Sequence, residues 1–147
     1  MEIIQKIIHA ITQVHPPHIM FVHFPIGLAG GAAFFILLAV IFKKEIFEKI
    51  AFADISLAAV SAIIAGALGI RDNLHFFNGN APYYKLKIIL GIILFVITAA
   101  TALLRWRYPN LFHVKTARVF YILAYLVSFP ITIALGFLGG VIVFGGL

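Results

Sequence analysis

Four long apolar segments constrain the fold of this chain more than any other feature. The first runs over residues 20–42 without an ionised side chain, long enough for a helix to cross a hydrocarbon layer of ~30 Å at ~1.5 Å per residue. Residues 50–70, 88–104 and 119–144 form three further apolar segments. With 63% hydrophobic and 11% charged residues, the composition lies far outside that of soluble domains. We therefore predict an all-α integral membrane protein folded as a four-helix bundle.

A short amphipathic segment precedes the first span. Over residues 2–14 the apolar side chains share one stripe of a helix, and the polar side chains lie opposite. The segment is too short to span a bilayer, so we predict that it lies in the membrane plane until Pro16 and Pro17 break it. The predicted organisation is an interfacial helix over residues 1–15 and a four-span bundle over residues 16–147.

The basic residues predict an orientation. The first and third loops, with the helix ends beside them, carry Lys43, Lys44, Lys49, Arg105, Arg107, Lys115 and Arg118. The opposite end carries fewer, namely Lys6, Arg71, Lys85 and Lys87. By the positive-inside rule the first and third loops face the cytoplasm, and both termini lie on the outer, periplasmic side. The same rule accounts for the net charge of +6, so we expect no nucleic-acid partner.

Three of the six histidines, His15, His18 and His23, cluster in the sequence "HPPHIMFVHFPIG". A neutral imidazole presents a lone pair and is a common ligand to haem iron, zinc and copper. On a regular helix His18 and His23 are separated by ~140°, so they would serve different partners. His23 lies about one turn inside the span, where an ionisable group usually faces the bundle interior. It is either a ligand or a polar group bonded to a carbonyl freed by Pro25, whereas His15 and His18 are either ligands or polar groups at the membrane interface.

Two kinds of bound group are compatible with these residues. A b-type haem buried in a bundle takes axial ligands from different helices. His23 would be one axial ligand, His18, His75 or Lys87 would compete for the second position, and Arg71 could pair with a propionate. The alternative is a mononuclear metal site formed by His15, His18 and His75, and His23 is a further candidate metal ligand. The chain has no cysteine, which excludes disulfides, thiolate metal sites and covalently attached haem.

Catalytic signatures are missing from the sequence. It contains no Gly-x-Ser-x-Gly elbow, no phosphate-binding loop and no His-Glu-x-x-His helix, so we expect no hydrolase activity. A second interpretation therefore stands beside the cofactor site: a cofactor-free structural or accessory subunit of a larger respiratory or photosynthetic membrane complex, packed through faces of small residues.

Three motifs resemble those of a known family. "HIMFVHFPIGL" at residues 18–28 resembles the His-Pro-x-x-Val-His-Phe-Pro-Ile-Ala-Leu signature of the domain-of-unknown-function 2231 family, small bacterial membrane proteins with four spans. "GIRDNLHFF" with "KLKIILGI", and the C-terminal "GFLGGVIVFGG", resemble its second and third motifs. Lys87 stands where the family often has histidine, and Phe137 where some members carry another.

The resemblance implies a redox setting. Members of this family accompany cytochrome-like domains, which suggests a protein of the bacterial inner membrane that takes part in electron transfer and binds haem b at its outer face. The partners so implied are the lipid bilayer, other membrane subunits and an external cytochrome.

Overall fold

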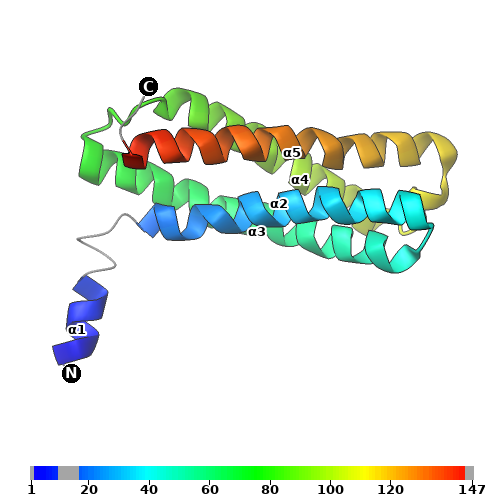
Figure 1. Ribbon diagram of the computed structural model, residues 1–147, viewed down its shortest axis with the longest axis horizontal. Helices are drawn as coiled ribbons and strands as arrows, with labels where there is room; N and C mark the ends of the chain where they lie inside the picture. The colour runs from blue at the N-terminus through cyan, green and yellow to red at the C-terminus, as the bar shows by residue number, and fades with distance from the viewer. Residues whose placement is uncertain (1, 10–16, 145–147) are drawn as a thin grey trace.

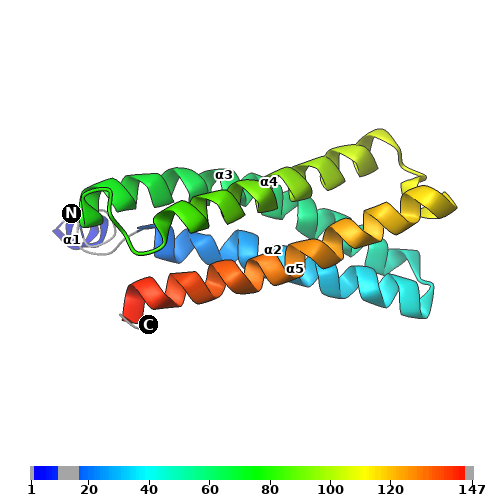
Figure 2. The same ribbon diagram turned by 90° about the horizontal axis from the view of Figure 1, so that it is seen from above.

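The computed structural model describes residues 2–9 and 17–144. Its helices are α1 (Glu2–His9), α2 (Pro17–Phe42), α3 (Glu45–Phe77), α4 (Tyr84–Arg107), the short 3-10 helix η2 (Leu111–His113) and α5 (Lys115–Phe144). The four long helices α2 to α5 run side by side in an antiparallel bundle (Figures 1 and 2). The predicted all-α four-helix fold is confirmed.

Each long helix extends beyond the apolar segment that predicted it. The extension is largest in α3, which has 33 residues. Charged residues on both sides of the apolar segment 50–70, such as Glu45 and Arg71, belong to the helix and not to the loops. All four long helices have the length and composition required to cross a membrane.

The links between the helices are short and use left-handed backbone at a few positions. Between α2 and α3 stand only Lys43 and Lys44, and Lys43 has a φ of 53°. At the end of α3 the N–H of Gly79 donates to the carbonyl of Asn73 over 2.9 Å, which closes the last turn. Gly79 has a φ of 81°, a conformation that only glycine adopts without strain.

Small side chains set the distance between the helices. α2 packs against α3 and α5, and α4 completes the ring by packing against the same two helices. Alanines fill the α2–α3 contact, since Ala29, Ala32, Ala33, Ala39, Ala51, Ala58 and Ala59 are all buried. In a membrane, where lipid is as apolar as leucine, such close backbone approach is what favours helix association.

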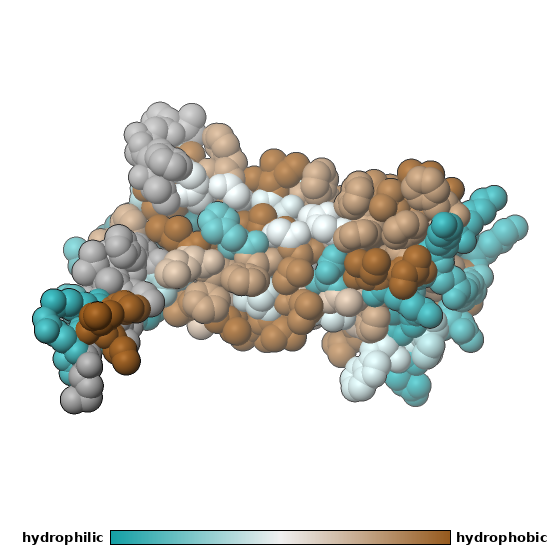
Figure 3. Space-filling view, turned by 60° about the horizontal axis from the view of Figure 1, so that its bottom comes forward, coloured by the Kyte–Doolittle hydropathy of each residue, from teal (hydrophilic) through white to brown (hydrophobic). Residues whose placement is uncertain are grey.

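The outer surface of the bundle is apolar along most of its length. Figure 3 shows a broad hydrophobic belt, with hydrophilic residues gathered toward the two ends of the molecule. Bulky side chains such as Phe34, Ile63, Ile92 and Phe120 are largely exposed on this belt. It is the surface that lipid tails cover in a membrane protein.

The first helix, α1, carries three exposed isoleucines, Ile3, Ile4 and Ile7, and an ion pair of 2.6 Å between Glu2 and Lys6. The described part of this helix covers Glu2–His9, and the predicted continuation to residue 14 falls outside the described residues. Residues 10–16, which include His15, lie outside the described part of the chain. The membrane-surface position of this helix stays a prediction.

Candidate functional site

Polar residues gather at the two ends of the bundle. We call the end where residues 78–83 link α3 to α4 the loop-two end, and the opposite end, where residues 43–44 link α2 to α3, the loop-one end. The start of α2 and the end of α5 lie at the loop-two end (Figure 1). All the predicted ligands that the structure describes belong to its half of the molecule.

His18 joins the start of α2 to α3 through two hydrogen bonds. Its backbone N–H, one of the donors that a helix leaves unsatisfied at its start, donates to Oδ2 of the buried Asp72 over 2.8 Å. Its ring nitrogen Nδ1 lies 2.8 Å from the carbonyl oxygen of Ala65. Because a carbonyl only accepts, Nδ1 carries the proton, and in the neutral ring the lone pair is on Nε2.

Gly69 makes this arrangement possible. A Cβ atom at Gly69 would lie 3.1 Å from both Cε1 and Nδ1 of the His18 ring. The imidazole therefore occupies the space above a glycine backbone, one helical turn after the carbonyl that it contacts. The Gly69 and Asp72 of the "GIRDNL" motif have distinct roles: the first accommodates the ring of His18, and the second caps the helix that carries it.

Two basic residues adjoin this contact. Arg71 Nη1 lies 3.0 Å from Oδ1 of Asp72, so the carboxylate accepts from the α2 backbone with one oxygen and from a guanidinium with the other. Lys87, at the start of α4, is half-buried and lies within electrostatic range of the His18 ring. Asp72 thus contacts both His18 and Arg71, and Lys87 lies near the His18 ring.

His23 lies elsewhere on α2, and the expectation that it faces the bundle interior is wrong. Its side chain is exposed, like those of Met20 and Phe24, and the backbone of Gly27 is exposed on the same face. The reason is helical phase: Pro25 belongs to the buried stripe of α2, and a residue two positions earlier is rotated by ~200° to the other side. His23 is nevertheless close enough to His18 to interact electrostatically.

His75 is also exposed, near the end of α3, and its ring packs edge-on against Phe76 at 4.8 Å between centroids. Within residues 2–9 and 17–144 no three His, Asp or Glu side chains form a group that could hold a metal ion. Among the described residues the structure therefore does not bring His18, His23 and His75 together as metal ligands. His15 lies outside the described residues, so a metal ion held by these histidines stays a prediction.

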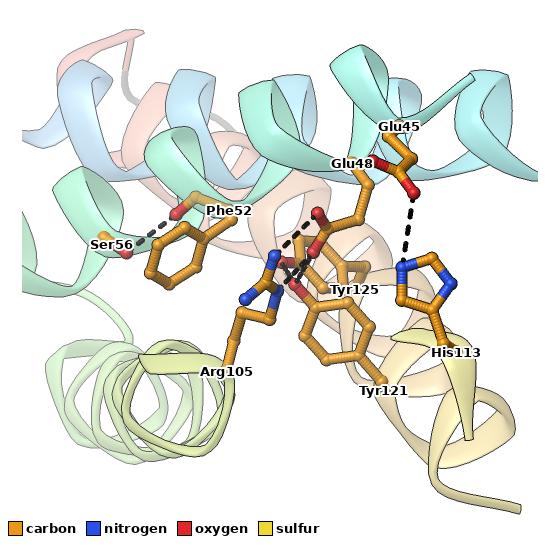
Figure 4. A network of polar contacts seen from close by, with 8 residues as sticks. All are labelled: Glu45, Glu48, Phe52, Ser56, Arg105, His113, Tyr121 and Tyr125. Atoms are coloured by element: carbon orange, nitrogen blue, oxygen red, sulfur yellow. Dashed lines mark hydrogen bonds and ion pairs between the residues drawn. The ribbon is translucent and has the colours of Figure 1, made fainter. Parts of the chain in front are cut away.

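At the loop-one end the structure reveals a buried ionic network that the sequence did not predict (Figure 4). Glu48 of α3 is 3% exposed and accepts two hydrogen bonds from Arg105 of α4, 2.7 Å from Nε and 3.1 Å from Nη2. This bidentate geometry is the strongest form of carboxylate recognition available to arginine. It joins two helices in a position where neither charge could remain alone without a large desolvation cost.

Tyrosines of α5 complete this network. The hydroxyl of Tyr121 donates to Glu48 Oε1 over 2.9 Å and lies 2.7 Å from the hydroxyl of Tyr125. Since the Tyr121 proton points to the carboxylate, Tyr125 must donate to the Tyr121 oxygen. We call these four residues, Glu48, Arg105, Tyr121 and Tyr125, the Glu48 network; it joins α3, α4 and α5.

The fit of these residues to a haem is partial. His23 offers an accessible imidazole, as an axial ligand requires. His18 lies five residues nearer the helix start and has its Nδ1 hydrogen-bonded to the backbone, so it is not at the same depth as His23. Within the described residues, a single copy of the chain therefore supplies one accessible axial nitrogen at this depth.

Fold and contacts together define a class of protein: a four-span α-helical membrane protein whose helices are joined at both ends by buried charged residues. The profile of the family described as "Predicted membrane protein (DUF2231)" matches residues 14–146. The chain therefore belongs to the domain-of-unknown-function 2231 family, as its motifs predict. No curated protein and no solved structure matches it.

Proposed function

We propose that this protein is a membrane subunit that works as part of a larger assembly and contacts it through the exposed face of α2 around His23. The observation that supports the proposal is the exposure of this imidazole at a depth where the bundle is otherwise apolar. A polar ring facing hydrocarbon lacks a hydrogen-bond partner, and such a position is costly unless another protein or a bound group supplies one.

The depth of His23 follows from the polar residues at the two ends. Lys87 and Arg105 stand 18 residues apart on α4, and ~27 Å of helix between them is close to the thickness of a hydrocarbon layer. Lys87 lies at the level of His18, with which it interacts. His23 is five residues further along α2, ~7 Å deeper. Its short side chain cannot reach the headgroups as a lysine would.

The second candidate function is electron transfer with a haem b. It is favoured by the accessibility of the His23 ring, which could coordinate iron, and by the half-exposed Arg71, which could pair with a propionate. His18, His75 and Lys87 remain the candidates on this chain for the second axial position. When bound, a haem supplies a one-electron redox centre, and an external cytochrome or a respiratory or photosynthetic complex would exchange electrons with it.

The orientation belongs to the same proposal. With the loop-one end in the cytoplasm of a bacterial cell, the basic side chains of the first and third loops follow the positive-inside rule. The loop-two end and His23 then face the periplasmic side of the inner membrane. An external electron donor or acceptor would approach from that side.

One preparation tests both candidates. The tagged full-length chain is extracted from its own membranes at native expression, and its stoichiometric companions and its absorption spectrum are measured. We expect an assembly that contains the chain in fixed proportion and weakens in His23→Ala, while His113→Ala, an imidazole at the loop-one end, leaves it intact. A Soret band that shifts on reduction and vanishes in His23→Ala supports the haem candidate. A colourless monomer without companions overturns both.

A further inference from the structure

The exposed surface around His23 has a definite shape. We define the His23 surface as Met20, His23, Phe24 and Gly27 of α2, which are all exposed. Phe24 is 60% and Met20 54% exposed, so both protrude. At Gly27, one turn beyond His23, a Cβ atom would meet nothing within 4 Å. The surface therefore pairs protruding apolar side chains with an open notch.

These features specify what an occupant must offer. It must provide a hydrogen-bonding group at the depth of His23, because hydrocarbon provides none. It must also bring a side chain or a helix backbone close to Gly27, since small residues mark positions where membrane helices approach closely. It needs no charged group, because residues 20–42 contain no ionised side chain and so present none to pair with.

We propose that the occupant is a second copy of this chain, bound through the His23 surface about a twofold axis perpendicular to the membrane. This inference rests on the proposed role as a subunit of an assembly and names the partner. A twofold axis places identical residues opposite one another, so the surface must be complementary to itself.

The His23 surface meets this requirement. A neutral imidazole has one donor and one acceptor nitrogen, so the ring of one copy can donate to the ring of the other. Two copies with the same orientation place both rings at one depth. The open notch at Gly27 allows the two α2 backbones to approach closely beyond the rings. Without an ionised side chain on this stretch of α2, no like charges oppose the approach.

Cysteine cross-linking tests the contact directly, because the chain has no cysteine of its own. Gly27→Cys is oxidised with copper phenanthroline in intact membranes. The matched control is Val96→Cys on α4, which is 55% exposed and nine residues beyond Lys87, as Gly27 is beyond His18. We expect a disulfide-linked dimer from Gly27→Cys and at most a tenth as much from Val96→Cys.

The hydrogen bond has its own test, made on the wild-type background by measuring dimerisation in lipid nanodiscs or mild detergent. His23→Leu should weaken dimerisation by ~3-fold to ~20-fold, the range that one hydrogen bond between membrane helices produces. His23→Asn should retain most of it, since an amide also donates and accepts. Gly27→Leu should abolish it by filling the notch, and helix content by circular dichroism checks that each variant folds.

The outcomes separate this inference from the proposed function. A chain that stays monomeric at every protein-to-lipid ratio overturns the inference, as does equal cross-linking of Gly27→Cys and Val96→Cys. Cross-linking of Gly27→Cys to a different membrane protein also overturns it, while leaving the subunit role standing. If the chain is a monomer and Gly27→Cys forms no cross-link to any protein, both the homodimer and the proposed subunit role are contradicted.

Discussion

Through the Glu48 network, Arg105→Leu should destabilise the protein, and a second substitution at Glu48 should restore part of the lost stability. Arg105→Leu removes hydrogen bonds of 2.7 and 3.1 Å and the charge opposite a carboxylate whose side chain is 4% exposed. Removing one partner of a buried ion pair costs about 3–5 kcal/mol, because the other charge stays buried without compensation. We expect a loss of this size in the free energy of unfolding.

The tyrosines should matter less. Tyr121→Phe removes one hydrogen bond to Glu48 and leaves the Tyr125 hydroxyl without its acceptor. A hydrogen bond to a charged group contributes ~1.5–3 kcal/mol in soluble proteins, and bonds between membrane helices average ~0.6 kcal/mol. The expected loss therefore lies between these values and below that of Arg105→Leu. Tyr125 contacts no charged group directly, so the loss of stability in Tyr125→Phe should be close to the smaller of these values.

The double variant Glu48→Met/Arg105→Leu is the decisive measurement. It replaces the pair by apolar side chains of similar volume, an exchange that is often neutral or stabilising by ~1–4 kcal/mol. It should therefore be more stable than Arg105→Leu alone. The assay is reversible unfolding in mixed micelles by titration with SDS, followed by circular dichroism. If the double variant is as unstable as Arg105→Leu or less stable, the buried charge of Glu48 is not the cause and the reasoning fails.

Four further substitutions, measured in the same assay, probe the rest of the molecule. Gly69→Ala should destabilise by ~1–3 kcal/mol because its Cβ would lie 3.1 Å from the His18 ring, whereas Gly66→Ala on the same helix, with nothing within 4 Å, should be tolerated. Asp72→Ala should cost ~0.5–2 kcal/mol through loss of a helix cap, with faster amide exchange at the start of α2 as its signature. His113→Ala removes an exposed contact of 3.4 Å with Glu45 and should change stability by less than ~1 kcal/mol, and a larger loss would contradict the view that exposed polar pairs contribute little.

The helices were predictable because hydrophobicity alone selects a membrane span. The apolar run at residues 20–42 and the helix Pro17–Phe42 agree closely for this reason. The ends of α3 were not predictable by the same signal, because Glu45 and Arg71 look like loop residues in a hydropathy profile. They continue the helix since its backbone bonds are local and do not require an apolar environment.

The side-chain contacts depended on information that one sequence does not carry. Arg105 reads as one more basic residue beside the cytoplasm, and only the packing of α3 against α4 shows that it pairs with Glu48. His23 was expected inside because polar residues in spans usually face inward, but Pro25 lies on the buried side of α2 and His23, two residues earlier, is exposed. The contacts of His18 did have a counterpart in the sequence, namely the second motif. Its Gly69 leaves space for the His18 ring, and its Asp72 caps the start of the helix that carries His18.

The 33 residues of α3 amount to ~50 Å of helix, more than the ~40–45 Å of a bilayer with its headgroups included. An upright α3 is therefore longer than the bilayer by about one turn. If that excess lies at the loop-two end, the turn at Asn78 and Gly79 and the last side chains of the helix stand above the headgroups. A water-soluble protein that arrives from this side would meet that turn before it touches any lipid.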